Sequence, residues 1–314
     1  MPSTDHPYRI QGLRVNRREA LRYAFVAGVG LVAIPLIGCG ESEEKAKATS
    51  TPVATATAVP PSGFFDSDGV KIHYETFGDG YPIVLVHGYV LNITWCWENS
   101  GLLDALTPIR RVVALDCRGH GQSDKPHDTE AYAVENMAGD VLNLMDYLGI
   151  EKADLFGYSM GGAISCHLLA YHTERFRSAV LTGPPIRFVL GPTDESRAGV
   201  MASAMLADDI SQITDPTARP FRALADAIPV SDRQALAACA RSLDESQPIP
   251  PADLVGVDIP VIIINGENDN VAGNPDELVA AIPGARKVII PGADHLVVFD
   301  PRFKEPVLSF LEEQ

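Results

Sequence analysis

A serine set between two glycines is the feature of this sequence with the clearest chemical meaning. The pentapeptide Gly157-Tyr158-Ser159-Met160-Gly161 follows the apolar run 153–156 and precedes a segment with helical character. A sharp turn from strand to helix lifts the central hydroxyl clear of the sheet and crowds the flanking positions, which must therefore be glycine. The start of the next helix favours negative charge at that point. The motif in this setting predicts that Ser159 is a nucleophile.

A serine hydroxyl is a weak nucleophile until a base takes its proton, and His295 has the position of such a base. It ends Gly292-Ala293-Asp294-His295, just beyond the last apolar run, and it follows the candidate acid in the expected chain order. His87 and His120 lie beside glycine in tight loops, where a structural hydrogen bond is the usual role. No partner motif surrounds the remaining histidines, which are His6, His73, His127, His167 and His172.

The base in turn needs a carboxylate that holds its tautomer and stabilises the imidazolium. Asp269 ends Gly266-Glu267-Asn268-Asp269, directly after the apolar run 261–264. Glu267 is a competitor that lies close to the end of the strand, and Asp294 is a competitor next to the base, from where it reaches the ring poorly. Placement after the strand therefore favours Asp269.

The oxyanion that forms during acyl transfer requires backbone N–H donors, each of which lowers the barrier by about 2.7–4 kcal/mol. The amide of Met160, directly after the nucleophile, is one expected donor. The amide of Tyr89, in His87-Gly88-Tyr89 after the run 82–86, is the other. Three aromatic residues near these motifs are candidates for a substrate pocket, although simple packing is an equally common role: Trp95, Trp97 and Tyr158.

Short apolar runs that alternate with helical segments predict the elements that position these residues. Runs of this kind suit strands that are buried on both faces of a parallel sheet. The expected strands are 70–77, 82–86, 112–115, 153–156, 179–181, 261–264 and 287–290. The expected helices are 134–148, 161–172, 275–282 and 302–311. The alternation predicts an α/β fold with a doubly wound, mostly parallel sheet.

One segment, 185–251, interrupts this alternation, because it contains no convincing strand. It contains helical pieces at about 198–207, 219–227 and 231–241. Long insertions in compact domains are usually functional, so we expect a small helical lid over the carboxyl edge of the sheet; a loose surface insertion is the alternative.

The chain resembles the α/β-hydrolase superfamily over about residues 64–313. The resemblance rests on H-G-Y at 87–89, D-C-R-G-H-G-Q-S-D at 116–124, G-Y-S-M-G-G at 157–162, G-E-N-D at 266–269 and G-A-D-H at 292–295, in the family's order. It implies an α/β-hydrolase fold with a Ser-His-Asp triad. A second set of residues looks like the family's structural loop after the fourth strand: Asp116, Arg118, His120 and Ser123. A serine at 159 excludes the dehalogenase and epoxide hydrolase branches, whose nucleophile is aspartate.

These features predict an esterase-like serine hydrolase that cleaves a small ester or similar acyl substrate through an acyl-enzyme. The resemblance leaves lactonases and carbon–carbon bond hydrolases in the set, and a cofactor-free perhydrolase or haloperoxidase is the alternative reaction. An alternative of another class is a non-catalytic binding protein on a hydrolase scaffold. We expect no metal and no organic cofactor.

The amino terminus has the layout of an export signal, with a basic region before a short apolar run at 23–38. Arg17-Arg18 with Leu21 and Arg22 partly resembles a twin-arginine signal. Leu36-Ile37-Gly38-Cys39 resembles a lipobox, in which cleavage leaves Cys39 as a lipidated first residue. A plain signal-anchor with an incidental cysteine is the alternative. We therefore expect an export signal over 1–38 and a location in the cell envelope.

Residues 39–63 are expected to act as a flexible linker between this lipid anchor and a hydrolase domain over 64–314. Segment 40–62 contains no aromatic residue and is rich in Ala, Thr, Pro and Ser, so it cannot bury enough apolar surface to offset the entropy of ordering. Contact with the membrane is expected only through the anchor. The formal net charge of −16 argues against nucleic acid as a partner. The cysteines of the domain are expected to be small buried hydrophobes, with a disulfide left open: Cys96, Cys117, Cys166 and Cys239.

Overall fold

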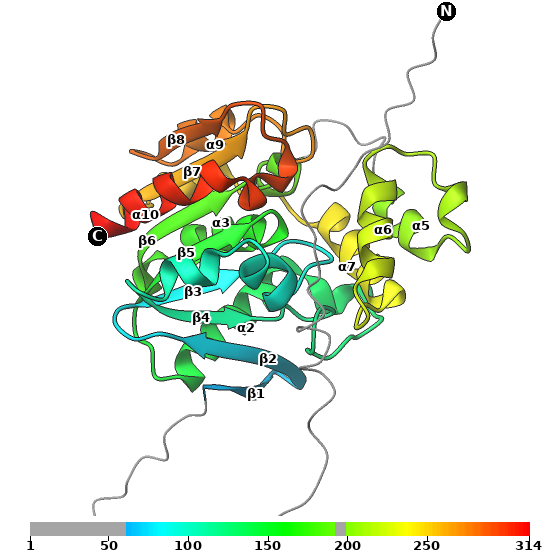
Figure 1. Ribbon diagram of the computed structural model, residues 1–314, viewed down its shortest axis with the longest axis horizontal. Coiled ribbons are helices and arrows are strands. Elements are labelled where there is room, and N and C mark those ends of the chain that lie inside the picture. Colours follow the sequence, from blue (N-terminus) through cyan, green and yellow to red (C-terminus); the bar gives the residue numbers. More distant parts are fainter. Residues whose placement is uncertain (1–60, 192–198) are drawn as a thin grey trace, which may run out of the picture. The chain divides into compact units, whose positions relative to one another are not determined.

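The apolar runs of the sequence lie side by side in one eight-stranded sheet (Figure 1). The structure, a computed structural model, describes residues 61–191 and 199–314. Its strands are β1 (Ser62–Ser67), β2 (Val70–Phe77), β3 (Pro82–Val86), β4 (Arg111–Leu115), β5 (Ala153–Tyr158), β6 (Phe176–Thr182), β7 (Val261–Gly266) and β8 (Arg286–Ile290). All seven expected strands are present, and several extend beyond the apolar run that predicted them.

The order of the strands across the sheet is β1-β2-β4-β3-β5-β6-β7-β8. The first two pairings, β1 with β2 and β2 with β4, are antiparallel, and every other pairing is parallel. β3 lies between β4 and β5, with Ile83 opposite Val112 on one side and Asp154 on the other. The central strands are almost wholly buried, as their continuous apolar runs require. The predicted α/β, mostly parallel sheet is therefore confirmed.

Helices cover both faces of this sheet (Figure 1). α1 (Leu102–Leu106) and α10 (Lys304–Glu312) pack together on one face. The other face carries α2 (Val134–Tyr147), α3 (Met160–Tyr171), α8 (Pro251–Leu254) and α9 (Asp276–Ala281). The buried side of α2 includes Met137, Val141 and Leu144, at the helical spacing that predicted it.

Two strands differ from the expectation. β1 was not predicted, because its SGFFDS sequence is short and polar at both ends; it begins at Ser62 and pairs along its whole length with β2. β6 begins at Phe176 and not at 179, although Arg177 and Ser178 are polar. Both polar side chains donate hydrogen bonds to the fully buried Asp154 of β5, which allows them to lie in the sheet.

The expected helical insertion lies at the carboxyl ends of the parallel strands (Figure 1). It comprises α4 (Ile186–Val189), α5 (Val200–Leu206), α6 (Ala218–Ala227) and α7 (Arg233–Glu245), with residues 192–198 outside the described part of the chain. Helix α5 packs on both α6 and α7, and α7 also packs on the turn at Thr129–Tyr132. We call α4–α7 the lid.

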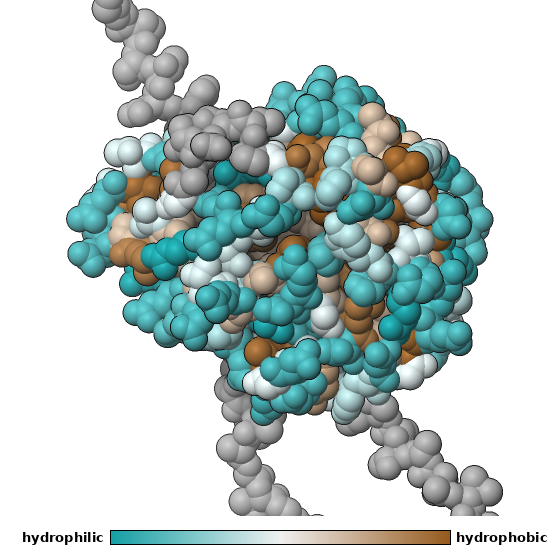
Figure 2. Space-filling view, turned by 180° about the vertical axis from the view of Figure 1, so that it is seen from behind, coloured by the Kyte–Doolittle hydropathy of each residue, from teal (hydrophilic) through white to brown (hydrophobic). Residues whose placement is uncertain are grey.

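The predicted export signal over 1–38, the predicted lipidation site at Cys39 and most of the predicted linker lie outside the described residues. Within the part that the structure describes, no helix is long and apolar enough to cross a membrane. The face shown in Figure 2 is mainly hydrophilic, with hydrophobic residues in several separate groups, in keeping with the acidic composition of the chain.

Candidate active site

Ser159 sits at the sharp turn between β5 and α3 with φ 53° and ψ −116°, in a region that non-glycine residues rarely occupy. Its amide donates a 2.8 Å hydrogen bond to the carbonyl oxygen of Thr182 in β6. Glycine is required on both sides of the turn. A Cβ at Gly157 would collide with the Ser165 hydroxyl and the Gly161 carbonyl, and a Cβ at Gly161 would collide with the Val86 carbonyl of β3. Close packing therefore requires glycine at both positions, as the sequence motif predicts.

The structure brings Ser159, His295 and Asp269 into one hydrogen-bonded chain. The Ser159 Oγ lies 2.9 Å from His295 Nε2, and His295 Nδ1 lies 3.1 and 3.0 Å from the two carboxylate oxygens of Asp269. All three side chains are buried, with Ser159 only 5% exposed. If Nδ1 carries the proton, it donates to Asp269, and Nε2 is free to accept the proton of Ser159. This is the geometry that general-base activation of a serine requires.

The loops after β7 and β8 hold Asp269 and His295, the expected acid and base. Oδ1 of Asp269 also accepts hydrogen bonds from the amides of Val271 and Ala272, at 3.0 and 2.9 Å. The two competing carboxylates have other partners. Glu267 accepts the amide of Gly292 at 2.7 Å, and Asp294 accepts the amide of Leu296 at 2.9 Å as the cap of a short helical turn. Of the three carboxylates, Asp269 is the one that contacts the His295 ring.

The two amides expected at an oxyanion site both lie beside Ser159. Met160 is the first residue of α3, and Tyr89 follows the end of β3. Neither amide has a hydrogen-bond acceptor among the described residues. Both residues line the pocket that contains Ser159. Two unpartnered N–H groups beside a serine hydroxyl can stabilise an oxyanion that develops there.

The loop that carries Tyr89 is held by a neutral histidine and by the lid. Nε2 of His87 accepts the amide of Cys117 at 3.0 Å, and its Nδ1 lies 2.8 Å from the Gly88 carbonyl oxygen and donates to it. Burial lowers the pKa of His87, which keeps the ring uncharged. The Tyr89 hydroxyl donates a 2.7 Å hydrogen bond to the carbonyl oxygen of Leu236 in α7. The sequence motif gave no sign of this last contact, because its partners lie 147 positions apart.

A pocket of about 320 Å³ opens between Ser159 and the lid. Its volume lies at the lower end of the range for small-molecule sites. Its walls are largely apolar and include Met160, Ile186, Phe188, Val200, Met201, Phe221, Leu243 and Val271. The centroid of the Phe221 ring lies 6.4 Å from that of His295 and 6.0 Å from that of Tyr89, so the lid extends to the residues beside Ser159. The lining also contains Arg187, Asp244 and Glu277, which no local motif marks as site residues.

The aromatic candidates from the sequence occupy other places. None of Trp95, Trp97 and Tyr158 is among the residues that line this pocket. Trp97 is fully buried and packs on Phe156 of β5. Tyr158 lies against the base, with ring centroids 5.6 Å apart, and its hydroxyl donates a 2.8 Å hydrogen bond to the His295 carbonyl oxygen. Tyr158 therefore helps to hold His295 in place.

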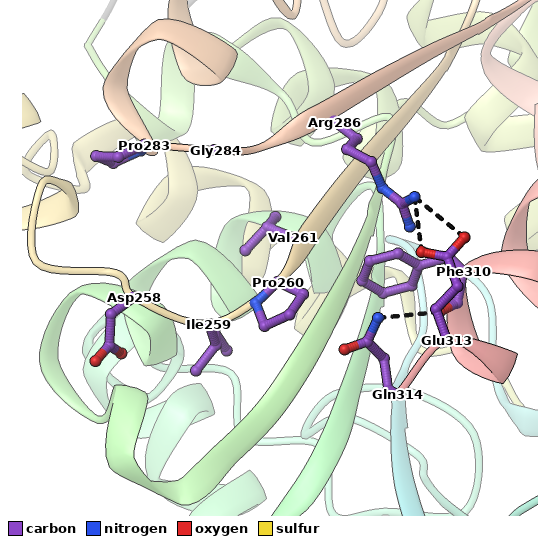
Figure 3. A pocket seen from close by; sticks show the side chains of 10 residues that line it. All are labelled: Asp258, Ile259, Pro260, Val261, Pro283, Gly284, Arg286, Phe310, Glu313 and Gln314. Carbon is purple, nitrogen blue, oxygen red and sulfur yellow. Dashed lines mark hydrogen bonds and ion pairs between the residues drawn. The ribbon is translucent and has the colours of Figure 1, made fainter.

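A second cavity, of about 420 Å³, lies where β7 begins (Figure 3). Arg286 pairs there with Glu313 at 2.8 Å and stacks on Phe310. None of the described residues that line it is a serine, cysteine or histidine. It therefore lacks the groups for nucleophilic catalysis.

The four cysteines of the described domain are buried thiols that form no disulfide with one another: Cys96, Cys117, Cys166 and Cys239. Burial raises the pKa of Cys166 to about 12, which makes thiolate chemistry at that residue unfavourable.

Comparison with known proteins places this geometry in a family. The family model for the α/β-hydrolase fold matches residues 81–212. A putative non-heme chloroperoxidase from Synechocystis sp. (strain ATCC 27184 / PCC 6803 / Kazusa) is 32% identical over 257 residues, which cover 74% of this chain and 91% of that protein.

Solved structures give the same result. An enol-lactonase from Burkholderia xenovorans LB400 has a TM-score of 0.68 at 25% identity, and the match covers 80% of this chain and 100% of the enol-lactonase chain. A hydrolase from Pseudomonas aeruginosa PA01 has a TM-score of 0.67 at 27% identity, with 80% of this chain and 98% of that chain covered. With its mostly parallel eight-stranded sheet and its serine at the turn after β5, this chain belongs to the α/β-hydrolase fold family.

Proposed function

We propose that this protein is a serine hydrolase that cleaves a carboxylic ester or a similar acyl bond through an acyl-enzyme. The observation that carries the proposal is the hydrogen-bonded chain from Ser159 Oγ through the His295 ring to Asp269, at 2.9 and 3.0 Å. Membership of a hydrolase family supports the reaction class. The intact chain of three groups argues against a purely ligand-binding role.

In the first half of the reaction, Ser159 Oγ attacks the carbonyl carbon while His295 Nε2 takes the hydroxyl proton. Asp269 holds the ring in the tautomer that leaves Nε2 unprotonated and stabilises the imidazolium that forms. The carbonyl oxygen becomes an oxyanion and accepts hydrogen bonds from the amides of Met160 and Tyr89. The carbon–oxygen bond to the alcohol then breaks, and His295 gives its proton to the departing alkoxide.

In the second half, a water molecule replaces the alcohol. His295 accepts a proton from this water as its oxygen attacks the acyl carbon, and the same two amides stabilise the second oxyanion. The bond between the acyl group and Ser159 Oγ breaks, and the proton returns to Oγ. The carboxylic acid leaves, and the enzyme is regenerated without any other reactant.

Turnover of p-nitrophenyl esters by purified wild-type protein and by Ser159→Ala tests this function. We expect hydrolysis by the wild type and a loss of at least about 10³-fold in kcat in the variant, because the nucleophile is removed. Ser203→Ala is the matched control: Ser203 is exposed on α5 and does not line the pocket. Ester turnover that persists in Ser159→Ala at the wild-type rate would contradict the mechanism.

A second candidate reaction, perhydrolysis, is favoured by the relative named as a putative non-heme chloroperoxidase. In this reaction hydrogen peroxide replaces water as the group that attacks the acyl-enzyme, and a peracid leaves. Parallel assays of ester hydrolysis and of peracid formation from acetate and hydrogen peroxide separate the two. A catalytic efficiency for peracid formation above that for esters would favour the second candidate.

We also propose that the protein acts in the cell envelope, held to the membrane by a lipid on Cys39. The support is the basic region, apolar run and lipobox-like sequence before Cys39. One acyl chain alone gives only marginal membrane binding, so stable attachment requires more than one chain.

A further inference from the structure

An ion pair in the wall of the Ser159 pocket has no part in the reaction described above. Arg187, in α4, and Asp244, in α7, both line this pocket. Nη2 of Arg187 lies 2.9 Å from Oδ1 of Asp244. The pair therefore places a formal positive and a formal negative charge in the wall of a largely apolar site.

Asp244 is held firmly in this position. Its second oxygen, Oδ2, accepts a 2.7 Å hydrogen bond from the amide of Gly199, the residue before α5. Its side chain is only 7% exposed, whereas that of Arg187 is 27% exposed. The Arg187 guanidinium also lies 4.1 Å from the centroid of the Phe188 ring. The cation is therefore anchored on one side by an aromatic ring and neutralised on the other by a buried carboxylate.

The charge balance of the pocket disfavours anions. Among the described residues that line it, Arg187 is the single lysine or arginine, whereas Asp244 and Glu277 are both acidic. A substrate carboxylate would have to compete with Asp244 for Arg187 and would leave one buried charge unpaired, which is costly. A neutral acyl or alcohol group meets the apolar wall and uncharged polar residues such as Thr217, Asn270 and Asn274, and it leaves the ion pair intact.

We infer that the pocket selects uncharged substrates, and that Asp244 determines this specificity because it keeps Arg187 from binding a substrate carboxylate. This inference rests on the proposed ester hydrolysis and narrows its substrate class to neutral esters and lactones. It also predicts a direction of change. Without the Asp244 charge, Arg187 becomes a free cation in the wall, and a carboxylate on the substrate gains a partner.

Two esters of equal carbon number test the inference: p-nitrophenyl hexanoate and the mono-p-nitrophenyl ester of adipic acid, which is an anion at neutral pH. We expect wild-type kcat/KM to favour hexanoate by about 100-fold, and Asp244→Asn to reduce this preference by about 10- to 100-fold. Asparagine retains an oxygen for the Gly199 amide. Asp104→Asn is the matched control, because it makes the same charge change at an exposed position of α1 outside the pocket.

The double variant Arg187→Met/Asp244→Asn tests whether the freed Arg187 causes the reduced preference for the neutral ester. The inference predicts that its preference returns toward the wild-type value, since the freed cation is gone. Equal turnover of both esters by the wild type, or an unchanged preference in Asp244→Asn, would overturn the inference while leaving ester hydrolysis intact.

Binding without turnover keeps the inference separate from the proposed function. Ligand-observed NMR titration compares hexanamide with adipic acid monoamide on wild-type protein and on Asp244→Asn. We expect the wild type to bind hexanamide in preference to the anion, and the variant to lose that preference. If neither ester is cleaved, the proposed function fails, and this titration still decides whether the pocket discriminates by charge; equal binding of both amides to the wild type would refute the inference.

Discussion

Ser159 has a rarely occupied backbone conformation that costs on the order of 1–3 kcal/mol relative to a common one. The surrounding residues hold it in that conformation. Its amide is bound to Thr182 of β6, and α3 packs so closely on β3 that Gly161 meets the Val86 carbonyl. These contacts aim the hydroxyl at the His295 ring instead of allowing it to cap α3, where it makes no hydrogen bond. The strain of one residue is therefore offset by the packing of three strands and a helix.

A substitution at Asp269 tests whether this residue orients the His295 ring. Asp269→Asn keeps the size of the side chain and removes its charge, so the amide nitrogen can donate to Nδ1 and favour the wrong tautomer of His295. We expect kcat for ester hydrolysis to fall by up to about 10⁴-fold. Glu267→Gln is the matched control, since Glu267 lies in the same loop and contacts the Gly292 amide. A variant at Asp269 that retains full kcat would show that another group orients the base.

Some site residues are marked by a local sequence motif, whereas others are brought together only by the fold. Ser159, His295 and Asp269 could be found from sequence because each follows a strand, and the carboxyl ends of neighbouring parallel strands meet at one edge. Arg187 and Asp244 could not, because their pairing depends on how two lid helices fold together, 57 positions apart. The aromatic residues near the motifs were uninformative, since large side chains fill a core as readily as a pocket.

At the scale of elements, the lid is organised around a buried arginine. Arg222, in α6, is only 4% exposed. Its guanidinium donates to the carbonyl oxygens of Ala204 and Ala207, at 3.0 and 2.7 Å, and pairs with Asp226 one turn along its own helix. Carbonyls at the end of a helix lack partners within that helix, so Arg222 ties the end of α5 to α6. This contact makes α5 and α6 one unit above the pocket.

Arg222→Leu should loosen the lid more than the sheet. The change leaves the Ala204 carbonyl without its buried donor, at a cost of about 1–3 kcal/mol, whereas the Ala207 carbonyl keeps a 3.3 Å hydrogen bond from Arg233 Nη1. We expect faster hydrogen exchange in α5 and α6, with exchange in β3, β5 and β6 close to that of the wild type. Arg219→Leu, on the exposed side of α6, is the control. Equal acceleration in the lid and the sheet would mean that the lid does not open on its own.

The elements themselves were mostly predictable, and the exceptions have physical causes. Apolar runs marked the buried strands because both of their faces are covered by helices. β1 was not predicted because it is a partly exposed edge strand, in which Phe64 is 40% exposed, and so it lacks a continuous apolar run. The first residues of β6 were not predicted because they are polar: buried hydrogen bonds to Asp154 replace apolar packing there.

For the whole molecule, buried histidines link stability to pH. Burial, together with the nearby His87, lowers the pKa of His120 to about 3. In the unfolded chain this side chain takes up a proton near pH 6.5, whereas in the folded protein it stays neutral until the pH is far lower. The contribution of His120 to stability is therefore complete above about pH 6.5 and is lost as the pH falls toward about 3.

His120→Asn should flatten this dependence. The asparagine amide can replace Nδ1 as a donor to the Arg118 carbonyl oxygen, which lies 2.9 Å from the ring, but it does not titrate. Between pH 5.5 and 4.5, we expect the free energy of unfolding of the wild type to fall by about 1.4 kcal/mol more than that of the variant. Urea unfolding at the two pH values measures both. Equal losses would show that His120 is protonated in the folded state.

The central claim, that Ser159 is the nucleophile of the reaction, has a direct test in a covalent label. Wild-type protein is treated with a fluorophosphonate, which reacts with an activated serine, and peptide mass spectrometry then maps the adduct. We expect a single phosphonyl group on Ser159, and at least about 10³-fold slower labelling in Asp269→Asn, since the base then lacks its partner. A label on another serine, or no label on folded wild-type protein, would contradict the account.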